Sequence, residues 1–447
     1  MCFGVSIRVL SLFTTGLCIL GQGSQTFMRQ DIKVGYGLLA LIFAILLALA
    51  MFVFSDWINF VASWVGCVGS TTSKSLCVGV HSAFRLSGCF VLFHILIALS
   101  CLTRDGFSKC VNEGLWGLKM FFIAGLFAGS LFIPNEYWLV YSRVAQWASL
   151  VYLFFQMVSV IDALYLWAEH WARKFSSGNN CYGCLLLFTS ILMYLGAGVI
   201  IYYSFLIFWI EGCGTNKIIL VSMPIFLVGF TTLILLRFHP TGSLITSGGM
   251  SLYGMFLAWN AFLSYPNQKM GTKCNPILED KWSMWVQLGT SLLVAFVCTF
   301  YWSVSDRKDM EMSKRAEEAK AGVAGVMNNT TQGRELMETG RADYGQGRLI
   351  DDVQAGGEND YSAYEDNSYL KFHAFMLLYG FYLSPLFTNW GNTSFNASGG
   401  GFNYGDSNMI APFVIKISIY GVGMLLYLWT IIAPQILTDR DFSQGWR

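Results

Sequence analysis

Charged residues are scarce in this sequence. Asp, Glu, Lys and Arg make up 12% of the 447 residues, whereas a soluble globular protein has about 25%. Apolar residues reach 55% and the mean hydropathy is +0.51, so polar side chains are too few to cover a water-facing surface of this size. This composition excludes a soluble globular protein, a disordered chain, a collagen and a small disulfide-rich secreted protein. It predicts a membrane protein that crosses the bilayer several times.

Basic excess and catalytic motifs are also lacking. The formal net charge is +1, which gives no footprint for nucleic acid. The Cys residues do not show the paired CxxC spacings of a zinc site, and the His residues form no HExxH cluster. Nucleotide-binding, hydrolase and acyltransferase motifs do not occur in the sequence. We therefore predict a protein that is not an enzyme and has no cofactor, no metal ion and no nucleic-acid partner.

The apolar runs are continuous and about 20 residues long, which is the length that a helix needs to cross a hydrocarbon core of about 30 Å. Strands of a membrane barrel would instead alternate in polarity over about 10 residues. The predicted fold is therefore an all-α polytopic membrane protein with about ten transmembrane helices. The predicted spans are 34–54, 79–102, 115–134, 137–172, 182–210, 217–236, 243–264, 282–303, 370–388 and 410–437.

The organisation along the chain divides into four segments. Residues 1–33 contain a first apolar stretch that lacks the basic n-region and clear cleavage site of a signal peptide, so we interpret it as a retained re-entrant segment. Spans one to eight occupy 34–303, a charged cytoplasmic linker occupies 304–369, and the last two spans with the C-terminal tail occupy 370–447. We predict that the linker contacts a neighbouring subunit, either a second copy of this chain or another membrane protein. Lys and Arg gather in the loops of one side, which predicts that both termini are cytoplasmic.

Several cysteines and two sequons lie in the loops predicted on the non-cytoplasmic side of the membrane. Four Cys fall in the predicted non-cytoplasmic loops, namely Cys67, Cys77, Cys213 and Cys274. An oxidising compartment permits disulfides there, but spacing leaves three pairings open. We prefer Cys67–Cys77 and Cys213–Cys274, since each pair would clip loops on one side. The sequons at Asn392 and Asn396 lie in the last outer loop and are the predicted glycosylation sites.

Among the ionisable residues inside predicted spans are Arg85, Lys119 and Asp162. A charge at the bilayer centre costs at least about 2.5–3.5 kcal/mol, so such residues are candidate functional sites. Arg85 and Lys119 lie near span ends, where a long side chain can reach the interface, and Lys416 is expected to do the same. Asp162 is too short to do so. Because Lys119 is the nearest cation along the chain, we predict an Asp162–Lys119 contact.

The predicted helix at 137–173 would be about 55 Å long, so it must tilt strongly or project from the bilayer. Polar residues follow one of its faces with 3-4-3 spacing: Ser149, Tyr152, Gln156 and Ser159, with Asp162 at the edge. Such a stripe is typical of hydrogen bonding between helices, but it could also line a polar furrow for a lipid head group. Elsewhere, small residues predict close helix contacts at Gly196, Gly198, Gly248, Gly249 and Gly254.

Five runs occur in an order and spacing typical of one family. They are NEGLWGLKMFFIAGLFAGSLFIPNEYW, FFQMVSVIDALYLWAEHW, SLYGMFLAWNAFLSYPNQKMGTKCNPIL, YSAYEDNSYLKFHAFMLLYGFYL and VIKISIYGVGMLLYLWTIIAPQILTDRDF. They are spread in this order from residue 112 to residue 442, and the combination resembles the serine incorporator family of membrane proteins.

The resemblance implies ten spans in two helical bundles joined by a long, tilted cross-member helix, which the 137–173 segment matches. It implies ATP-independent phospholipid transport or scrambling, or support of phosphatidylserine and sphingolipid synthesis. Arg85, Lys119 and Asp162 match polar positions of the family's core. The family often has His and Asn where this chain has Tyr165 and Ala168, which removes two polar groups from the cross-member helix.

Three functions remain open at this point. The first is a lipid transporter or scramblase in which Arg85, Lys119, Gln156, Ser159 and Asp162 form the lipid pathway and membrane phospholipids are the partners. The second is an accessory protein that presents serine for synthesis of phosphatidylserine and sphingolipids. The third is a structural subunit of a larger membrane assembly. For each, the chain is predicted to be an integral protein of the endomembranes, the plasma membrane or an organelle membrane.

Overall fold

The computed structural model describes the helical part of the chain. The described residues are 32–54, 57–58, 74–102, 106–236, 242–265, 274–276, 286–302, 369–388, 390, 393–396, 401–404 and 411–437. Residues 1–31 of the predicted re-entrant segment, residues 304–368 of the linker, Cys67 and Asn392 lie outside these residues. The predictions made for them therefore stay predictions.

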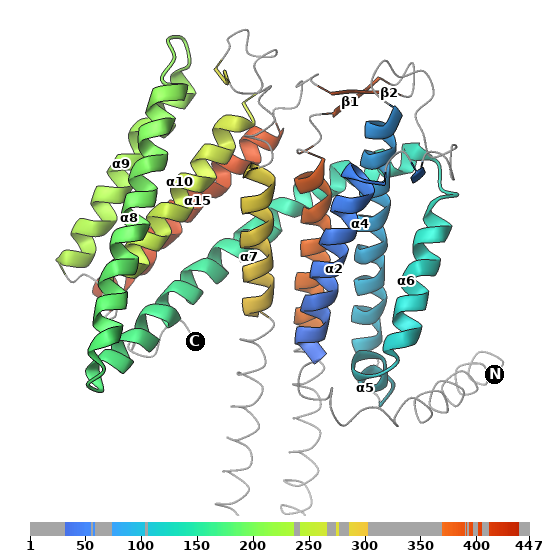
Figure 1. Cartoon of the computed structure of the whole chain (residues 1–447), viewed down its shortest axis with the longest axis horizontal. Coiled ribbons are helices and arrows are strands. Elements are labelled where there is room, and N and C mark those ends of the chain that lie inside the picture. The colour runs from blue at the N-terminus through green and yellow to red at the C-terminus, as the bar shows by residue number, and fades with distance from the viewer. Residues whose placement is uncertain are drawn as a thin grey trace, which may run out of the picture. The chain divides into compact units, whose positions relative to one another are not determined.

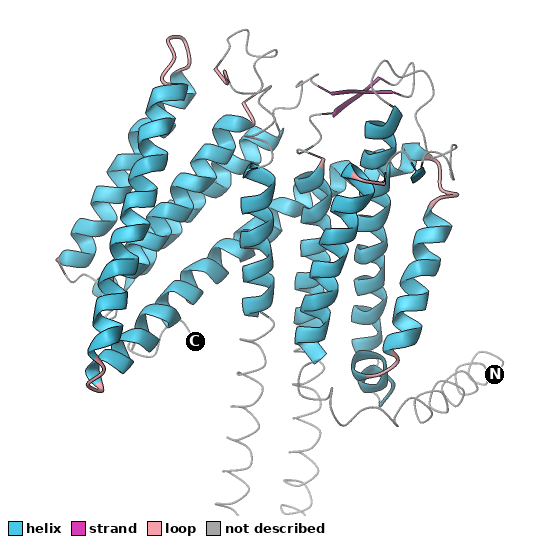
Figure 2. Ribbon diagram, in the orientation of Figure 1, coloured by secondary structure: helices cyan, strands magenta, loops and turns pink. Residues whose placement is uncertain are grey.

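Helices make up nearly all of the described chain (Figure 1, Figure 2). A helix lies within every range that the apolar runs predict as a span. The bounds are α2 Ile32–Phe52, α4 Lys74–Cys101, α5 Gly106–Glu113, α6 Trp116–Ser130, α7 Asn135–Ser176, α8 Asn180–Phe208, α9 Gly214–Leu235, α10 Leu244–Leu263, α15 Ala411–Ile436 and two unlabelled helices at 286–302 and 369–387. The exception is a short antiparallel hairpin in which β1, Thr393–Asn396, pairs with β2, Gly401–Tyr404.

Five of the described helices are long and apolar enough to cross a membrane: Val78–Cys101, Asn135–Ser176, Asn180–Phe208, Gly214–Leu235 and Ala411–Ile436. Their outward surfaces are apolar as well. Phe188, Leu195 and Leu206 on α8, for example, are 65%, 61% and 67% exposed. Exposed apolar surface of this extent indicates contact with lipid. The chain is a helical membrane protein, as the composition predicts.

The chain forms two compact units, each built from separate stretches of sequence. Unit 1 comprises Met1–Ala44, Gly88–Phe132 and Thr299–Leu377, and unit 2 comprises Ile45–Ser87, Ile133–Cys298 and Leu378–Arg447. Helix α7 and helices α8, α9, α10 and α15 belong to unit 2.

Helix α7 has 42 residues and appears as one continuous rod (Figure 1). It confirms the long helix predicted at 137–173. Pro134 precedes its first turn, Glu136 lies in that turn, and Arg173 and Lys174 lie in the last turn. These charges complement the helix dipole at both ends. At the C-terminus, Gly178 has φ +96°, and its N–H donates to Phe175 O while Asn179 N–H donates to Lys174 O. This glycine-terminated motif ends α7 and starts α8 within three residues.

The core of unit 2 is α10, which packs against α7, α8, α9 and α15. Its N-terminus is capped by Ser243 and Thr246 in a capping box. Glycines on α10 permit the close packing that the sequence predicts: a Cβ at Gly249 would lie 2.6 Å from Leu164 Cδ2, and one at Gly254 would collide with Met424. The prediction for Gly198 is wrong, because a Cβ there would meet nothing within 4 Å.

A glycine contact with backbone atoms occurs in another part of unit 2, between α2 and α4. A Cβ at Gly79 would lie 2.7 Å from the carbonyl oxygen of Met51 and 3.2 Å from its Cα. Both helices therefore meet backbone to backbone, and only glycine fits at this position.

Candidate functional site

Arg85 lies in unit 2 and is 1% exposed. Its Nη2 donates to Asn135 Oδ1 at 2.8 Å and to the carbonyl oxygen of Ile133 at 3.0 Å, and its guanidinium lies 5.5 Å from the ring of Trp138. The side chain is buried inside the protein, so it does not extend to the membrane interface, which was the alternative for this residue. Arg85 instead ties α4 to the residues that begin α7.

Lys119 is the centre of a buried polar cluster in unit 1. Its Nζ donates to Tyr36 Oη at 2.8 Å and to the carbonyl oxygen of Asn112 at 2.9 Å, and it lies 4.6 Å from the ring of Trp116. Lys119 is 6% exposed, so it too is buried and does not take the alternative of extending to the interface. Lys119 and Asp162 belong to different compact units, so their predicted contact stays a prediction.

Two histidines extend this cluster. His373 Nε2 lies 2.8 Å from Asn112 Oδ1, and His373 Nδ1 lies 2.9 Å from His94 Nδ1. The amide nitrogen of Asn112 donates to Ser108 O, which leaves Asn112 Oδ1 as an acceptor for the Nε2–H of His373. A neutral His373 then accepts from the Nδ1–H of His94. The cluster therefore links α4, α5 and the helix at 369–387 through side chains that the sequence places far apart.

We expect Lys119→Met to lower the free energy of unfolding by about 2 kcal/mol, because hydrogen bonds from a charged donor contribute about 1.5–3 kcal/mol and the acceptors would remain buried. The thermal midpoint in detergent, followed by Trp fluorescence, measures the change. Leu118→Met is the matched control, because Leu118 is 52% exposed and its replacement should leave the midpoint unchanged. Equal midpoints for both variants would contradict a stabilising role for Lys119.

The polar residues that share one face of α7 are buried, as expected for a face that packs against other helices. Ser149, Tyr152, Gln156 and Ser159 are all 3% exposed or less. The two serines donate hydrogen bonds to backbone carbonyl oxygens of α7 itself: Ser159 Oγ donates to Phe155 O at 2.8 Å and Ser149 Oγ donates to Ala145 O at 2.6 Å. Tyr152 Oη donates to Ala295 O at 3.4 Å. Asp162, one turn beyond Ser159, is half-buried. Gln156 is therefore the member of the stripe whose side chain remains available.

Gln156 lines a cavity of about 30 Å³ in unit 2, which has room for about two water molecules. Asn260 and Tyr253 of α10 and Lys416 of α15 line it as well. The buried Gln156 Oε1, Asn260 Oδ1 and Tyr253 Oη have no hydrogen-bond partner among the described residues. Because the amide nitrogen of Asn260 donates to Phe256 O, its oxygen is the atom left unpaired. The cavity thus presents free hydrogen-bonding atoms in an apolar protein.

Lys416 places its amino group at this cavity. Its side chain is 4% exposed, against the expectation that it reaches the interface. Nζ donates to Ser264 Oγ at 2.6 Å and lies 5.3 Å from the ring of Trp390. None of the described carboxylates pairs with it. An acidic oxygen of a ligand would stabilise the charged form of this buried amino group, so the cavity is complementary to a ligand that carries such an oxygen beside hydrogen-bond donors.

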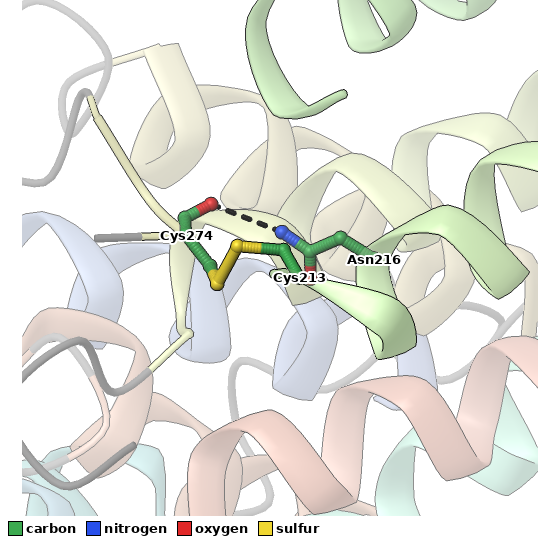
Figure 3. The surroundings of a disulfide bond; sticks show 3 residues. All are labelled: Cys213, Asn216 and Cys274. Atoms are coloured by element: carbon green, nitrogen blue, oxygen red, sulfur yellow. Dashed lines mark hydrogen bonds between the residues drawn. A yellow bond between two sulfur atoms is a disulfide. The ribbon is translucent and has the colours of Figure 1, made fainter. Parts of the chain in front are cut away.

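The preferred disulfide Cys213–Cys274 is present (Figure 3), with a Cα–Cα distance of 5.7 Å. Asn216 Nδ2 donates to the carbonyl oxygen of Cys274 at 3.0 Å and fastens the same loop. The other preferred disulfide, Cys67–Cys77, includes Cys67, which lies outside the described residues. That pairing stays a prediction. Of the two sequons, Asn396 ends strand β1, and glycosylation at either site stays a prediction.

Sequence reasoning missed most of the residues around these sites. His94 and His373 lie nearly 280 positions apart, and Asn260 lies in a run with no polar periodicity. Lys416 was visible only as a cation in an apolar run. Tyr165, whose ring lies 6.5 Å from that of Tyr427, and the buried Ala168 stand where the resemblance implies His and Asn. Across the described residues, no group of three or more His, Cys, Asp and Glu could hold a metal ion.

Apolar helices with outward-facing apolar side chains, a long continuous α7 and buried cationic clusters define a multi-span helical membrane protein. The sequence profile of the family described as "Serine incorporator (Serinc)" matches residues 10–440. The chain therefore belongs to the serine incorporator family.

Individual relatives agree with this assignment. A probable serine incorporator of Nematostella vectensis is 28% identical over 389 residues, which cover 80% of this chain and 79% of the relative. Serine incorporator 3 of Bos taurus is 28% identical over 403 residues, covering 81% and 79%. Serine incorporator 5 of Macaca fascicularis is 24% identical over 405 residues, covering 84% and 90%.

Proposed function

We propose that this protein binds membrane phospholipids and moves them between the leaflets without ATP. The observation that carries the proposal is a cavity lined by Lys416, Gln156 and Asn260, in which the two amide oxygens have no hydrogen-bond partner among the described residues. A phospholipid head group such as phosphoserine combines an anionic phosphate with hydrogen-bond donors. Lys416 Nζ would donate to a phosphate oxygen, and the two amide oxygens would accept from N–H or O–H groups. Such contacts replace water and lower the cost of carrying a polar group through lipid.

The described cavity is smaller than a head group, so passage requires α10 and α15 to separate from α7. Gly254 on α10 against Met424 on α15, and Gly423 on α15 against Met157 on α7, are contacts made by flexible methionine side chains. Methionine adapts to changes in packing more readily than branched residues do. These contacts support a helix arrangement that can widen at the cavity.

The remaining features of the proposal follow the family. We infer ten membrane spans in two bundles with α7 as the cross-member, cytoplasmic termini, and residence in the endomembranes or the plasma membrane. The lipid partners are phosphatidylserine and sphingolipids, and no covalent chemistry is required. Arg85, Lys119 and Asp162 act as buried polar groups of the pathway or its walls. The alternative of a structural subunit depends on the linker at 304–369, which lies outside the described residues.

A dithionite assay on purified protein in liposomes tests the proposal. Fluorescent phosphatidylserine in the outer leaflet is bleached, and bleaching beyond half requires lipid to cross. We expect Lys416→Met to slow the crossing about 10-fold, because a hydrogen bond to a charged group contributes about 1.5–3 kcal/mol and about 1.4 kcal/mol corresponds to a factor of ten. Gln156→Leu should slow it in the same direction.

Lys217→Met is the matched control, since Lys217 Nζ also lies 5.3 Å from a Trp ring, that of Trp209, but does not line the cavity. Its rate should equal that of the wild type. If bleaching by the wild-type protein stops at half, scrambling is excluded. If the wild type scrambles and Lys416→Met matches it, the pathway runs elsewhere.

A further inference from the structure

Two free thiols lie at the start of α8. Cys181 and Cys184 are both exposed, three positions apart in the first turns of the helix. Asn179 caps this end and accepts from the N–H of Cys181 at 3.3 Å. Cys89, Cys101 and Cys298 are buried. The pair at 181 and 184 is thus the accessible one, and nothing in the proposed lipid pathway uses it.

The surroundings of this pair are typical of a membrane surface. The ring of Trp171 packs at 5.1 Å from Trp167 and at 6.4 Å from Tyr182, which lies between the two cysteines. Arg173 and Lys174 end α7 just before the turn. Trp and Tyr favour the interface of the bilayer, and Lys and Arg beside a span favour its cytoplasmic side. The thiols therefore sit where a span leaves the bilayer.

The opposite end of α8 supports the same orientation. Helix α8 has 29 residues and is apolar enough to cross the membrane, and the disulfide partner Cys213 follows its far end. Disulfides persist in oxidising compartments, whereas cytoplasmic thiols stay reduced. A disulfide at one end and two free thiols at the other agree with a helix that joins an oxidising side to the cytoplasm.

A hollow on the outer face of α8 lies in line with Cys184. Its volume is about 470 Å³ and its lining is apolar, formed by Ile191, Tyr194, Leu195, Gly198, Val199 and Tyr202. Residues 184, 188, 191, 195, 198 and 202 follow 4-3-4-3-4 spacing and share one face of a helix. Fourteen residues separate Cys184 from Gly198, about 21 Å of helix, which is more than half of a hydrocarbon core of about 30 Å.

An acyl chain fits this arrangement. A chain attached at Cys184 would enter the lipid at the interface, lie along Phe188 and reach the hollow at about the depth of one leaflet. The hollow is open because Gly198 has no side chain and a Cβ there would meet nothing within 4 Å. Juxtamembrane cysteines are frequent sites of reversible S-acylation.

We propose that Cys184, with Cys181 as a second acceptor, is S-acylated by a long fatty chain that occupies the hollow of α8. The thiolate of Cys184 attacks the thioester carbonyl of a long-chain acyl-coenzyme A. The new carbon–sulfur bond forms as the old one breaks, and coenzyme A leaves as the thiol with the proton that the cysteine lost. A membrane acyltransferase catalyses the exchange. No oxidant or reductant is consumed.

The test uses the full-length protein from cells. Free thiols are blocked, thioesters are cleaved with neutral hydroxylamine, and the released thiols are labelled with maleimide-polyethylene glycol to give a gel shift. We expect a hydroxylamine-dependent shift in the wild type, a weaker one in Cys184→Ser and none in the variant with Cys181 and Cys184 both replaced by serine. The matched control Cys298→Ser, which removes a buried thiol, should keep the full shift.

A photo-activatable fatty acid with a diazirine at its chain end locates the chain. We expect crosslinks to the α8 peptide that contains Ile191 to Tyr202, and their loss in Gly198→Phe, which fills the hollow while leaving both thiols. A wild type without any hydroxylamine-dependent shift overturns the proposal. So does a label that appears only after dithiothreitol, since that outcome shows a disulfide between the two cysteines. Crosslinks that Gly198→Phe leaves unchanged overturn the assignment of the hollow.

Discussion

Replacing both Cys213 and Cys274 by serine is expected to lower the free energy of unfolding by about 4 kcal/mol. The disulfide closes a loop with a sequence separation of 61 residues, and the entropy of such a loop in the unfolded chain corresponds to about 4 kcal/mol. Both sulfurs lie in a buried environment, with Cys213 and Cys274 at most 1% exposed. The loop and the first turn of α9 would then depend on the hydrogen bond from Asn216 to Cys274.

Thermal unfolding in detergent, with and without reductant, measures this effect. Dithiothreitol should lower the midpoint of the wild type toward that of the double variant and leave the double variant unchanged. Asn216→Ala in the wild-type background should cost about 1 kcal/mol, the usual contribution of one hydrogen bond. A double variant that unfolds at the wild-type midpoint would show that the disulfide does not stabilise unit 2.

Replacing Gly79 by alanine is expected to cost about 3 kcal/mol, the upper part of the usual range for overpacking. The added methyl group would lie 2.7 Å from the carbonyl oxygen of Met51. This atom belongs to the backbone of α2, so no rotation of a side chain can relieve the contact. The helices must move apart, which loosens the packing of neighbouring residues along both helices. Valine at the same position should prevent recovery of folded protein.

The control for Gly79 is Gly125→Ala in α6, where a Cβ would meet nothing within 4 Å. Alanine has the higher helix propensity by about 1 kcal/mol, so this variant should match or exceed the wild type. Size-exclusion chromatography after stepwise heating compares the fraction of each protein that stays monodisperse. Equal behaviour of the variants at positions 79 and 125 would contradict the backbone contact between α2 and α4.

The helices could be predicted from the sequence because their signal is local. A run of about 20 apolar residues is by itself long enough to predict a helix that crosses the membrane. The continuous pattern over 137–173 is likewise enough to predict α7. The disulfide Cys213–Cys274 was one of three pairings that spacing allowed, and the preference rested on which loops share a side. The contact of Gly79 could not be predicted in this way. A glycine in an apolar run indicates neither which helix packs against it nor how closely that helix approaches.

The polar sites were predictable only in part. The charges of Arg85 and Lys119 in apolar runs identified them as exceptional, but their partners are carbonyl oxygens, an amide and a phenol. Such groups occur throughout the chain and carry no charge pattern that a sequence could reveal. The same holds for Lys416, whose surroundings come from α7, α10 and residue 390. These segments come together only on folding. The residue pattern within any one of them therefore does not predict the contacts between them.

Helix α7 has a consequence for the surrounding lipid. Its 42 residues correspond to about 63 Å, so if both ends lie in the head-group regions of a bilayer about 40–45 Å deep, they emerge about 45 Å apart in the membrane plane. The two leaflets then meet this rod at widely separated places. Lipids with shorter chains would press the rod flatter, and longer chains would raise it. The length of the acyl chains in the surrounding membrane would thereby set the tilt of α7.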